Sequence, residues 1–164
     1  MDLDVITRTV INPALALLSA GMDSPEARVM LLAIGLQESR FLHRRQIGGP
    51  ARGLWQFEQG GGVRGVLAHP ASRDAAQRIC AACRVAPAAA SVYPVLETDD
   101  VLACAFARLL LWTDAKRLPS VDDSSGAWSL YLRTWRPGKP HPQTWPALHA
   151  QATAAAGGRR ARVA

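Results

Sequence analysis

The stretch TDDVLACAFARLLLWTDAKR, residues 98 to 117, constrains the fold of this chain more than any other segment. Apolar side chains fill nearly every position from Val101 to Trp112, which leaves almost no polar face for water. A helix that is apolar on all sides belongs in the core of a larger helical domain. Thr98 or Asp99 is suited to cap its N-terminus. We therefore expect a helix here, central to a mainly α fold.

A second helix is predicted from residue 25 to about residue 39. Ser24-Pro25-Glu26 is a strong start signal, because serine caps helices, proline suits the first helical position and an acid suits the first turn. Further helices are expected at residues 3–20 (with Pro13 as a kink or break), 60–69, 72–84 (capped by Ser72), 124–135 and 144–156.

The remaining segments are expected to be loops, with at most a small β element near residues 45–60. Pro87 and Pro94 are expected to bracket another loop, because proline is unfavourable inside a helix. The predicted architecture is one mainly α domain over residues 1–156, with several helices around the central apolar helix. A flexible basic tail, residues 157–164, is expected to follow it.

The formal net charge of +6 favours polyanionic partners. All of the 19 basic residues except Lys116 and Lys139 are arginines, and three of the arginines lie in the final GGRRARVA. The other arginines are dispersed and form no recognition-helix cluster. Nucleic-acid binding, which would weaken steeply with salt, is therefore the last function we consider, and we expect no nucleic-acid partner.

No apolar run approaches the ~18 residues that a membrane span needs. The N-terminal sequence MDLDVITRTV is acidic where a secretory signal would be basic. We expect a chain made in the cytoplasm without a signal peptide, so that another component must carry it to any site outside.

The cysteines and histidines predict neither a metal site nor a cofactor. Cys80 and Cys83 have CxxC spacing without a second pair to complete a zinc site, and an odd number of cysteines makes no disulfide framework. We interpret Cys80, Cys83 and Cys104 as small buried apolar residues, in keeping with folding in a reducing compartment. The histidines have no metal-ligand spacing and are interpreted as surface or loop residues: His43, His69, His141 and His149.

Glu38 is unusual because it continues an apolar stripe. Ala27, Leu31, Ile34 and Glu38 follow one another on one side of the helix predicted at residues 25–39. Burial and the negative end of the helix dipole both disfavour a charged carboxylate there, so both raise the pKa of Glu38. A carboxyl group that stays protonated near neutral pH can act as a general acid.

A structural role for Glu38 is the alternative. The carboxylate could instead pair with Arg40, Arg44 or Arg45, or be exposed where the helix has ended.

Two short motifs near Glu38 resemble the lytic transglycosylase and goose-type lysozyme families of the lysozyme superfamily. Glu38-Ser39-Arg40-Phe41 is similar to the Glu-Ser-x-Phe that ends a helix in those families, and Gly53-Leu54-Trp55-Gln56 to the Gly-Leu-Met-Gln that follows after a loop. Pro50-Ala51-Arg52 resembles the family's approach to that glycine. A late Ala-Tyr-Asn-Ala-Gly motif has its nearest match in residues 134–138, Thr-Trp-Arg-Pro-Gly, where Trp-Arg replaces Tyr-Asn. The similarity covers about residues 25 to 140, in order.

The resemblance implies a lysozyme-like fold in which Glu38 is the catalytic acid, Ser39 helps to position it and Gln56 lines the sugar cleft. Arg136 either contacts the substrate or caps the end of its helix. The candidate sugar platforms are Trp55, Phe57, Tyr131 and Trp135. All of them except Trp135, which lies at a helix end beside Pro137-Gly138, fit a core position better.

Cleavage of a glycosidic bond needs an acid, and hydrolases usually need a second carboxylate, for which Glu58 is the candidate. A lytic transglycosylase needs one carboxylate, because the sugar's own 6-hydroxyl attacks and an anhydro product forms. One well-placed glutamate without an obvious partner therefore favours a lytic transglycosylase over a hydrolytic lysozyme (muramidase).

The resemblance thus implies a peptidoglycan-degrading enzyme that cleaves between N-acetylmuramic acid and N-acetylglucosamine. We expect it to act as a monomer on the glycan strands of the cell wall. Small size and the lack of a wall-binding module fit a bacteriophage endolysin released during lysis or a virion-associated lysin, with the virion or other phage proteins as candidate partners. The alternative is a catalytically inactive, lysozyme-like structural or glycan-binding phage protein.

Overall fold

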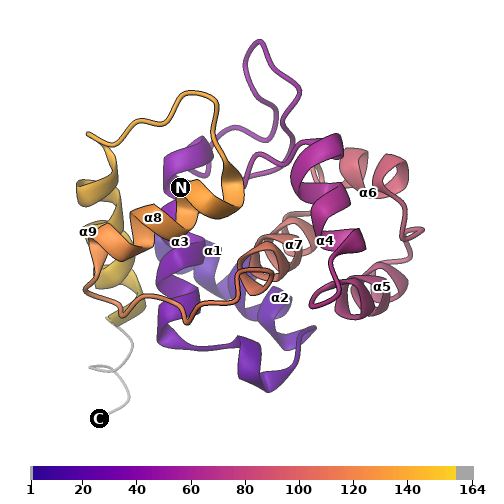
Figure 1. Ribbon diagram of the computed structural model, residues 1–164, viewed down its shortest axis with the longest axis horizontal. Coiled ribbons are helices and arrows are strands. Elements are labelled where there is room, and N and C mark those ends of the chain that lie inside the picture. The colour runs from indigo at the N-terminus through magenta and orange to yellow at the C-terminus, as the bar shows by residue number, and fades with distance from the viewer. Residues whose placement is uncertain (1, 158–164) are drawn as a thin grey trace.

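Helix α7 (Asp100–Trp112) runs through the middle of the molecule (Figure 1). The structure is a computed structural model that describes residues 2–157. Every residue of α7 from Leu102 to Leu111 is buried, as its almost wholly apolar sequence predicts, and Arg108 is buried with them. Asp99 is the cap, because its carboxylate accepts a hydrogen bond of 2.9 Å from the Leu102 N–H. Helix α7 is the central element of the core, because several other helices pack against it: α2 (Asn12–Ala16), α3 (Pro25–Ser39), α4 (Arg64–Ala68), α5 (Arg73–Ala82) and α8 (Ser124–Trp135).

The N-terminal helical segment continues through Pro13 instead of breaking there. Its successive parts are α1 (Leu3–Ile6), the π-helical turn η1 (Thr7–Ile11) and α2 (Asn12–Ala16). The wider π turn immediately precedes α2, so Pro13 falls in the first turn of a new α-helix, where a missing N–H costs little. The helix ends at Ala16, earlier than predicted, and the short 3-10 turn η2 (Ala20–Met22) follows.

Helix α3 (Pro25–Ser39) has the predicted bounds. The Ser24 hydroxyl accepts a hydrogen bond of 3.1 Å from the Ala27 N–H, which caps the first turn. Arg40, with a left-handed backbone (φ 56°), ends the helix. Helix α3 packs against α9 (Trp145–Gly157), the last described helix. This packing fixes the C-terminal end of α3, where Glu38 lies.

The remaining helical segments are η3 (Gln59–Val63, a π turn), α4 (Arg64–Ala68), α5 (Arg73–Ala82), α6 (Ala89–Val95) and α8 (Ser124–Trp135). Ser72 is the N-cap residue of α5, as predicted, but its side chain makes no capping hydrogen bond. The Ser72 hydroxyl is buried and donates a hydrogen bond of 2.7 Å to the Val66 carbonyl. The serine therefore joins α4 to α5.

The prediction of a loop between Pro87 and Pro94 is wrong, because α6 occupies most of that segment. Val92 and Leu96, four residues apart, are both fully buried and anchor one face of this short helix in the core. Pro94 lies inside the helix. The burial of two large apolar side chains outweighs the hydrogen bond that proline cannot make.

Residues 43–58 form the predicted loop, and no strand occurs anywhere in residues 2–157. The small β element expected near residues 45–60 reduces to two isolated antiparallel bridges, Arg45 with Arg52 and Arg52 with Phe57. Arg44 ties the loop to α7 through a bidentate pair with Asp100, at N–O distances of 2.9 and 2.5 Å. The loop is thus held by the backbone hydrogen bonds of these bridges and by side-chain contacts, without a sheet.

Residues 2–157 form one all-α domain of about eight helices. Helix α9 extends to Gly157, one residue past the expected end of the domain. The rest of the predicted tail, residues 158–164, lies outside the described residues. None of the described helices is long and apolar enough to cross a membrane.

Candidate functional site

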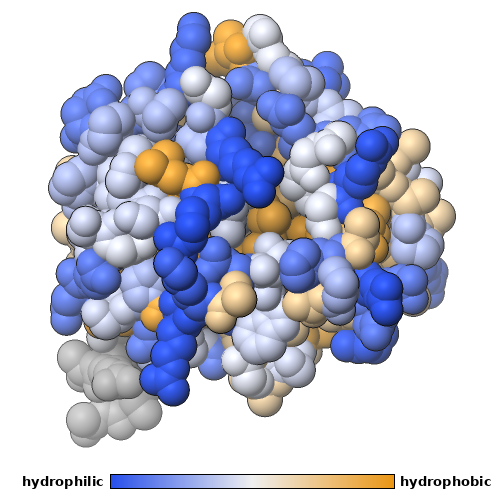
Figure 2. Space-filling view, in the orientation of Figure 1, coloured by the Kyte–Doolittle hydropathy of each residue, from blue (hydrophilic) through white to orange (hydrophobic). Residues whose placement is uncertain are grey.

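A cleft of about 1280 Å³ opens between the C-terminal end of α3, helix α8 and the η3–α4 segment. Figure 2 shows it as a hollow with hydrophobic residues at its floor and hydrophilic residues around it. Most of the residues that the sequence analysis singled out line this cleft: Glu38, Gln56, Phe57, Glu58, Tyr131, Trp135 and Arg136. Ser39 and Trp55 do not line it.

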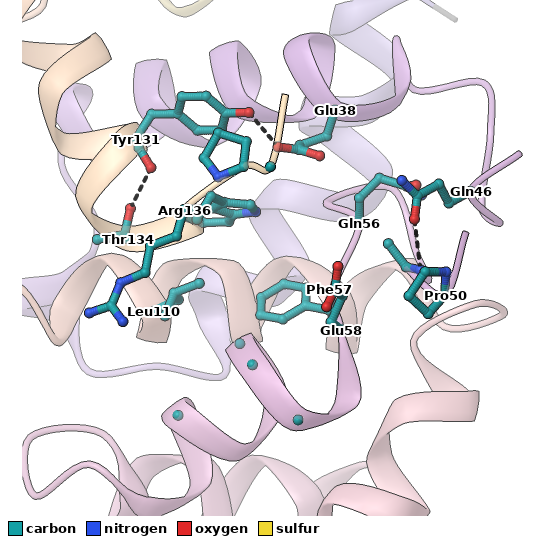
Figure 3. Close-up of a pocket in the computed structure, with 18 of the residues that line it drawn as sticks. Glu38, Gln46, Pro50, Gln56, Phe57, Glu58, Leu110, Tyr131, Thr134 and Arg136 are labelled. Atoms are coloured by element: carbon teal, nitrogen blue, oxygen red, sulfur yellow. Dashed lines mark hydrogen bonds between the residues drawn. The ribbon is translucent and has the colours of Figure 1, made fainter. Parts of the chain in front are cut away.

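Glu38 lies in the last turn of α3, and Figure 3 shows its carboxyl group at the wall of the cleft. Ala27, Leu31 and Ile34, which precede it on the same side of the helix, are fully buried. Burial raises the pKa of Glu38 to about 7, and a hydrogen bond from Tyr131 partly opposes this rise. A substantial fraction of this carboxyl group therefore carries its proton at neutral pH, and its pKa suits proton transfer in either direction.

The predicted alternative, an ion pair between Glu38 and a nearby arginine, is not found. Arg44 pairs with Asp100, and Arg45 pairs with Glu97. No ion pair within residues 2–157 includes Glu38 or Arg40. The carboxyl group is thus held by burial and by one hydroxyl.

That hydroxyl belongs to Tyr131 of α8, which donates a hydrogen bond of 2.6 Å to Glu38 Oε1. The Tyr131 ring is 3% exposed and stacks on Trp145 at a centroid distance of 5.3 Å and an interplanar angle of 15°. Because the ring is held between helices, its hydroxyl points at Glu38 in a fixed direction. Burial and the neighbouring carboxyl group raise the pKa of Tyr131, so the phenol stays a donor.

Ser39 connects the end of α3 to the Gly53–Gln56 segment. Its hydroxyl donates a hydrogen bond of 2.6 Å to the Leu54 carbonyl and accepts one of 3.1 Å from the Phe41 N–H. Gly53 has a left-handed backbone (φ 77°), and a Cβ atom there would lie 2.5 Å from the Leu96 carbonyl oxygen. Only glycine fits that position. The two motif-like segments are thus parts of one buried junction directly behind Glu38.

Several residues other than glycine adopt left-handed backbones in the motif-like segments. Arg40 (φ 56°) and Phe41 (φ 54°) follow Glu38, Gln56 (φ 51°) ends the second segment, and Arg136 (φ 49°) ends α8. In the rest of residues 2–157 only Arg84 (φ 57°) does so. Each such residue costs about 1–2 kcal/mol, and strain of this kind tends to gather at functional sites.

The predicted aromatic platforms divide into core and cleft residues. Trp55 is fully buried and its indole donates a hydrogen bond of 2.9 Å to the Leu31 carbonyl, so its ring is not available to a ligand. Tyr131 presents little more than its hydroxyl. Trp135 is half-buried, and its indole donates a hydrogen bond of 2.9 Å to the Trp55 carbonyl. Trp135 and Phe57 both line the cleft, with ring centroids 6.0 Å apart, but Phe57 is only 2% exposed, so Trp135 is the accessible ring of the two.

Charged residues border the cleft on several sides. Glu58 is exposed and lines it, beside the start of η3 (Figure 3). Arg136 both ends α8, where its Nε donates a hydrogen bond of 3.3 Å to the Arg133 carbonyl, and lines the cleft. Arg64 and Lys139 add further positive charge. An extended ligand with acidic groups would meet complementary charge here.

Sequence reasoning did not find the partner of Glu38. The sequence indicates Tyr131 only as a candidate sugar platform. Tyr131 lies four residues before Trp135, so both side chains are on the side of α8 that faces the cleft. Gln37 was not singled out, although it holds the segment after α8: its amide donates to the His141 carbonyl at 3.3 Å and its carbonyl accepts from the Thr144 hydroxyl at 2.9 Å. Neither contact has a local sequence signal, because each joins segments far apart in the chain.

The histidine prediction is wrong for His149, which is 4% exposed within α9 and lies 6.0 Å from the Trp145 ring. Burial lowers its pKa. His43, His69 and His141 are exposed, as predicted. No group of three or more metal-binding side chains occurs among the described residues. All three cysteines are free, and Cys80 and Cys104 are buried as expected, whereas Cys83 is half-buried.

We found no match to this chain among protein-family models, curated proteins or solved structures.

Proposed function

We propose that this protein is a peptidoglycan-cleaving glycosidase with Glu38 as its general acid and base. The proposal rests on one observation above all: a carboxyl group with a pKa of about 7 lies at the wall of a large cleft, oriented by a buried tyrosine. A group of this kind can protonate a leaving oxygen and then accept a proton in the next step. The resemblance of the segments around Glu38 and Gln56 to lytic transglycosylases supplies the substrate class.

In the proposed reaction, protonated Glu38 donates its proton to the glycosidic oxygen as the bond from that oxygen to C1 of N-acetylmuramic acid breaks. The leaving N-acetylglucosamine takes that oxygen as a hydroxyl group. The carboxylate of Glu38 then removes the proton from the 6-hydroxyl of the muramic acid, whose oxygen attacks C1 and closes an anhydro ring. Water in place of the 6-hydroxyl would give hydrolysis.

The lytic transglycosylase reaction is favoured over hydrolysis by the environment of the second acid. Glu58 lines the same cleft but is exposed, and no hydroxyl within residues 2–157 bonds to it as Tyr131 does to Glu38. Solvation leaves such a carboxylate a weaker stabiliser of the positive charge that develops on the sugar. A mechanism with one carboxylate therefore fits this cleft better than one with two.

We further propose a lysozyme-like fold and a place for this protein in bacteriophage attack on the cell wall. The first is supported by a buried central helix, a helix that ends in an acid at a cleft, and motifs in the family's order. The second follows from the resemblance, with activity at the wall after release during lysis or from the virion.

The decisive experiment is digestion of purified peptidoglycan by the wild type, Glu38→Gln and Glu58→Gln, with products identified by mass spectrometry. We expect anhydro-muropeptides from the wild type and Glu58→Gln, and none from Glu38→Gln. Reducing-end products that disappear in Glu58→Gln would instead identify a lysozyme with two carboxylates. If the folded wild type cleaves nothing, the enzyme proposal fails.

A glycan-binding protein without activity is the second candidate, favoured by the replacement of Tyr-Asn by Trp135-Arg136 and by the half-buried Trp135 ring in the cleft. Sedimentation with insoluble peptidoglycan separates the two candidates. A binder retains its affinity in Glu38→Gln and releases no soluble fragments in any variant.

A further inference from the structure

Arg108 lies within α7 and is only 2% exposed. Its Nε donates a hydrogen bond of 2.7 Å to the Met22 carbonyl, but its Nη1 is buried without a hydrogen-bond partner in residues 2–157. Asp23, the nearby acid that acts on Arg108 through its charge, is already paired with Arg28 at 2.7 Å. Burial lowers the pKa of Arg108 to about 10, so the guanidinium is still charged at neutral pH. A buried cation without a counter-ion is costly to a folded protein.

Arg108 also lines a second cavity, of about 720 Å³, whose lining shares only Asp114 with the cleft. Its charged lining residues are Glu26, Arg108, Asp114, Lys116 and Arg117. Asp114 is already paired with Arg133 at 3.0 Å. The three cations that line the cavity therefore outnumber its one remaining acid, Glu26. Ser24 lines the cavity at the start of α3, where the positive end of the helix dipole adds to this field.

Trp112 forms an apolar wall of the same cavity. The guanidinium carbon of Arg108 lies 5.1 Å from the centre of the Trp112 ring, and the tryptophan is 39% exposed. The cavity therefore combines a buried cation, two exposed cations and an accessible ring, a set of groups that can hold an anionic group on a larger molecule.

We propose that this second cavity binds a phosphate or carboxylate group, with Arg108 as the buried counter-charge and Lys116 and Arg117 at its rim. Arg108 differs from the many surface arginines, because its guanidinium is buried at the cavity with one N–H unpartnered, and a bound oxyanion would supply the counter-charge that the fold does not. The site is distinct from Glu38, so the proposal stands or falls independently of the glycosidase reaction.

The competing explanation is that Arg108 is only a structural residue, held by Trp112 and the Met22 carbonyl. In that case Arg108→Met would be tolerated and would change no response to anions. The test therefore compares the anion response of this variant with that of the wild type and of Arg78→Met, which removes an exposed arginine of α5 that lines neither cavity.

The full-length ¹⁵N-labelled protein is titrated with inorganic phosphate and, separately, with acetate, against chloride at matched ionic strength. We expect saturable shifts of the Trp112 indole N–H signal with at least one anion, while the indole signals of Trp55 and Trp145 stay in place. Saturation by phosphate or by acetate identifies which of the two groups the site prefers. Arg108→Met should weaken binding at least about tenfold, and Arg78→Met should leave it unchanged.

A second measurement covers the case in which Arg108→Met does not fold. The double variant Lys116→Ala/Arg117→Ala changes exposed residues and should weaken binding several-fold. The bound anion should also raise the melting temperature of the wild type more than that of the double variant. The proposal is overturned if neither anion gives saturable shifts, or if the variants bind as tightly as the wild type.

Discussion

The phenolic hydroxyl of Tyr131 lies 2.6 Å from Oε1 of Glu38, although the two residues are 93 positions apart in the chain. The tyrosine is fixed by stacking on Trp145, and the glutamate by its place in the last turn of α3. A half-buried carboxyl group with a pKa of about 7 is neither fully charged nor fully neutral near pH 7. Together with burial, this contact sets how much of the Glu38 carboxyl group is protonated near pH 7.

Replacing Tyr131 by phenylalanine should raise the pKa of Glu38 above its value of about 7. The hydroxyl stabilises the charged carboxylate, so its loss favours the protonated form, by about one pKa unit for a hydrogen bond to a charged group. Phenylalanine keeps the stacking on Trp145. The shift is measured by NMR titration of the ¹³C-labelled Glu38 carboxyl group. Tyr93→Phe is the matched control, because the Tyr93 hydroxyl bonds to the Pro50 carbonyl. An unchanged Glu38 titration in Tyr131→Phe would contradict the assigned role.

Glu38 should make the protein less stable as the pH rises from about 4.5 to about 7. Its pKa is 4.5 when exposed and about 7 when folded, so in this range the folded state binds more protons than the unfolded state. Stability is then highest below 4.5 and falls until the folded carboxyl group has ionised. In Glu38→Gln this dependence disappears, and above pH 7 the variant should be more stable than the wild type by up to about 3 kcal/mol.

Urea unfolding at a pH below 4.5 and at a pH about one unit above 7 checks this expectation. The exposed Glu58→Gln serves as the control for the loss of one acidic side chain from the same cleft. Equal stability of Glu38→Gln and the wild type above pH 7 would mean that the carboxylate is well solvated in the native protein.

The elements that the sequence predicted best have strong local signals. The Ser24-Pro25 start and the apolar positions that follow define α3 correctly, and the apolar run after Asp99 defines α7. Helix α6 is not predicted because proline is locally unfavourable inside a helix, and Pro94 lies there. The burial of Val92 in the core stabilises the helix in spite of that proline. Burial of that kind depends on the whole fold, so a local pattern does not show it.

The candidate site was predicted in part for the same reason. Glu38 stands out because a carboxylate on an apolar stripe is visible in the sequence itself. Trp135 is distinguished from Trp55 by its place at a helix end beside Pro137-Gly138, and it lines the cleft, whereas Trp55 is fully buried. The pairing of Glu38 with Tyr131 is a tertiary contact between α3 and α8, for which the sequence carries no local signal.

Gly53→Ala should destabilise the protein more than Gly48→Ala. Both glycines have left-handed backbones, with φ of 77° and 71°, so both substitutions carry the cost of about 1 kcal/mol of that conformation. Only at Gly53 would the new Cβ atom meet a neighbour, the Leu96 carbonyl oxygen at 2.5 Å, since nothing lies within 4 Å at Gly48. The difference between the two melting temperatures isolates this contact. Equal losses would show that the backbone of Gly53 can move away from Leu96.

Ser39→Ala should destabilise the junction behind Glu38 without touching the cleft surface. The substitution leaves the buried Leu54 carbonyl and Phe41 N–H without the hydroxyl that bonds to both, which should cost about 1–3 kcal/mol. Ser129→Ala is the matched control, because the Ser129 hydroxyl is exposed and bonds only within α8, so its loss should cost less than about 0.5 kcal/mol. Urea unfolding of both variants gives the two free energies. If Ser39→Ala is as mild as the control, then the Gly53–Gln56 segment is held in place by packing alone, and the serine of the first motif does not connect it to Glu38.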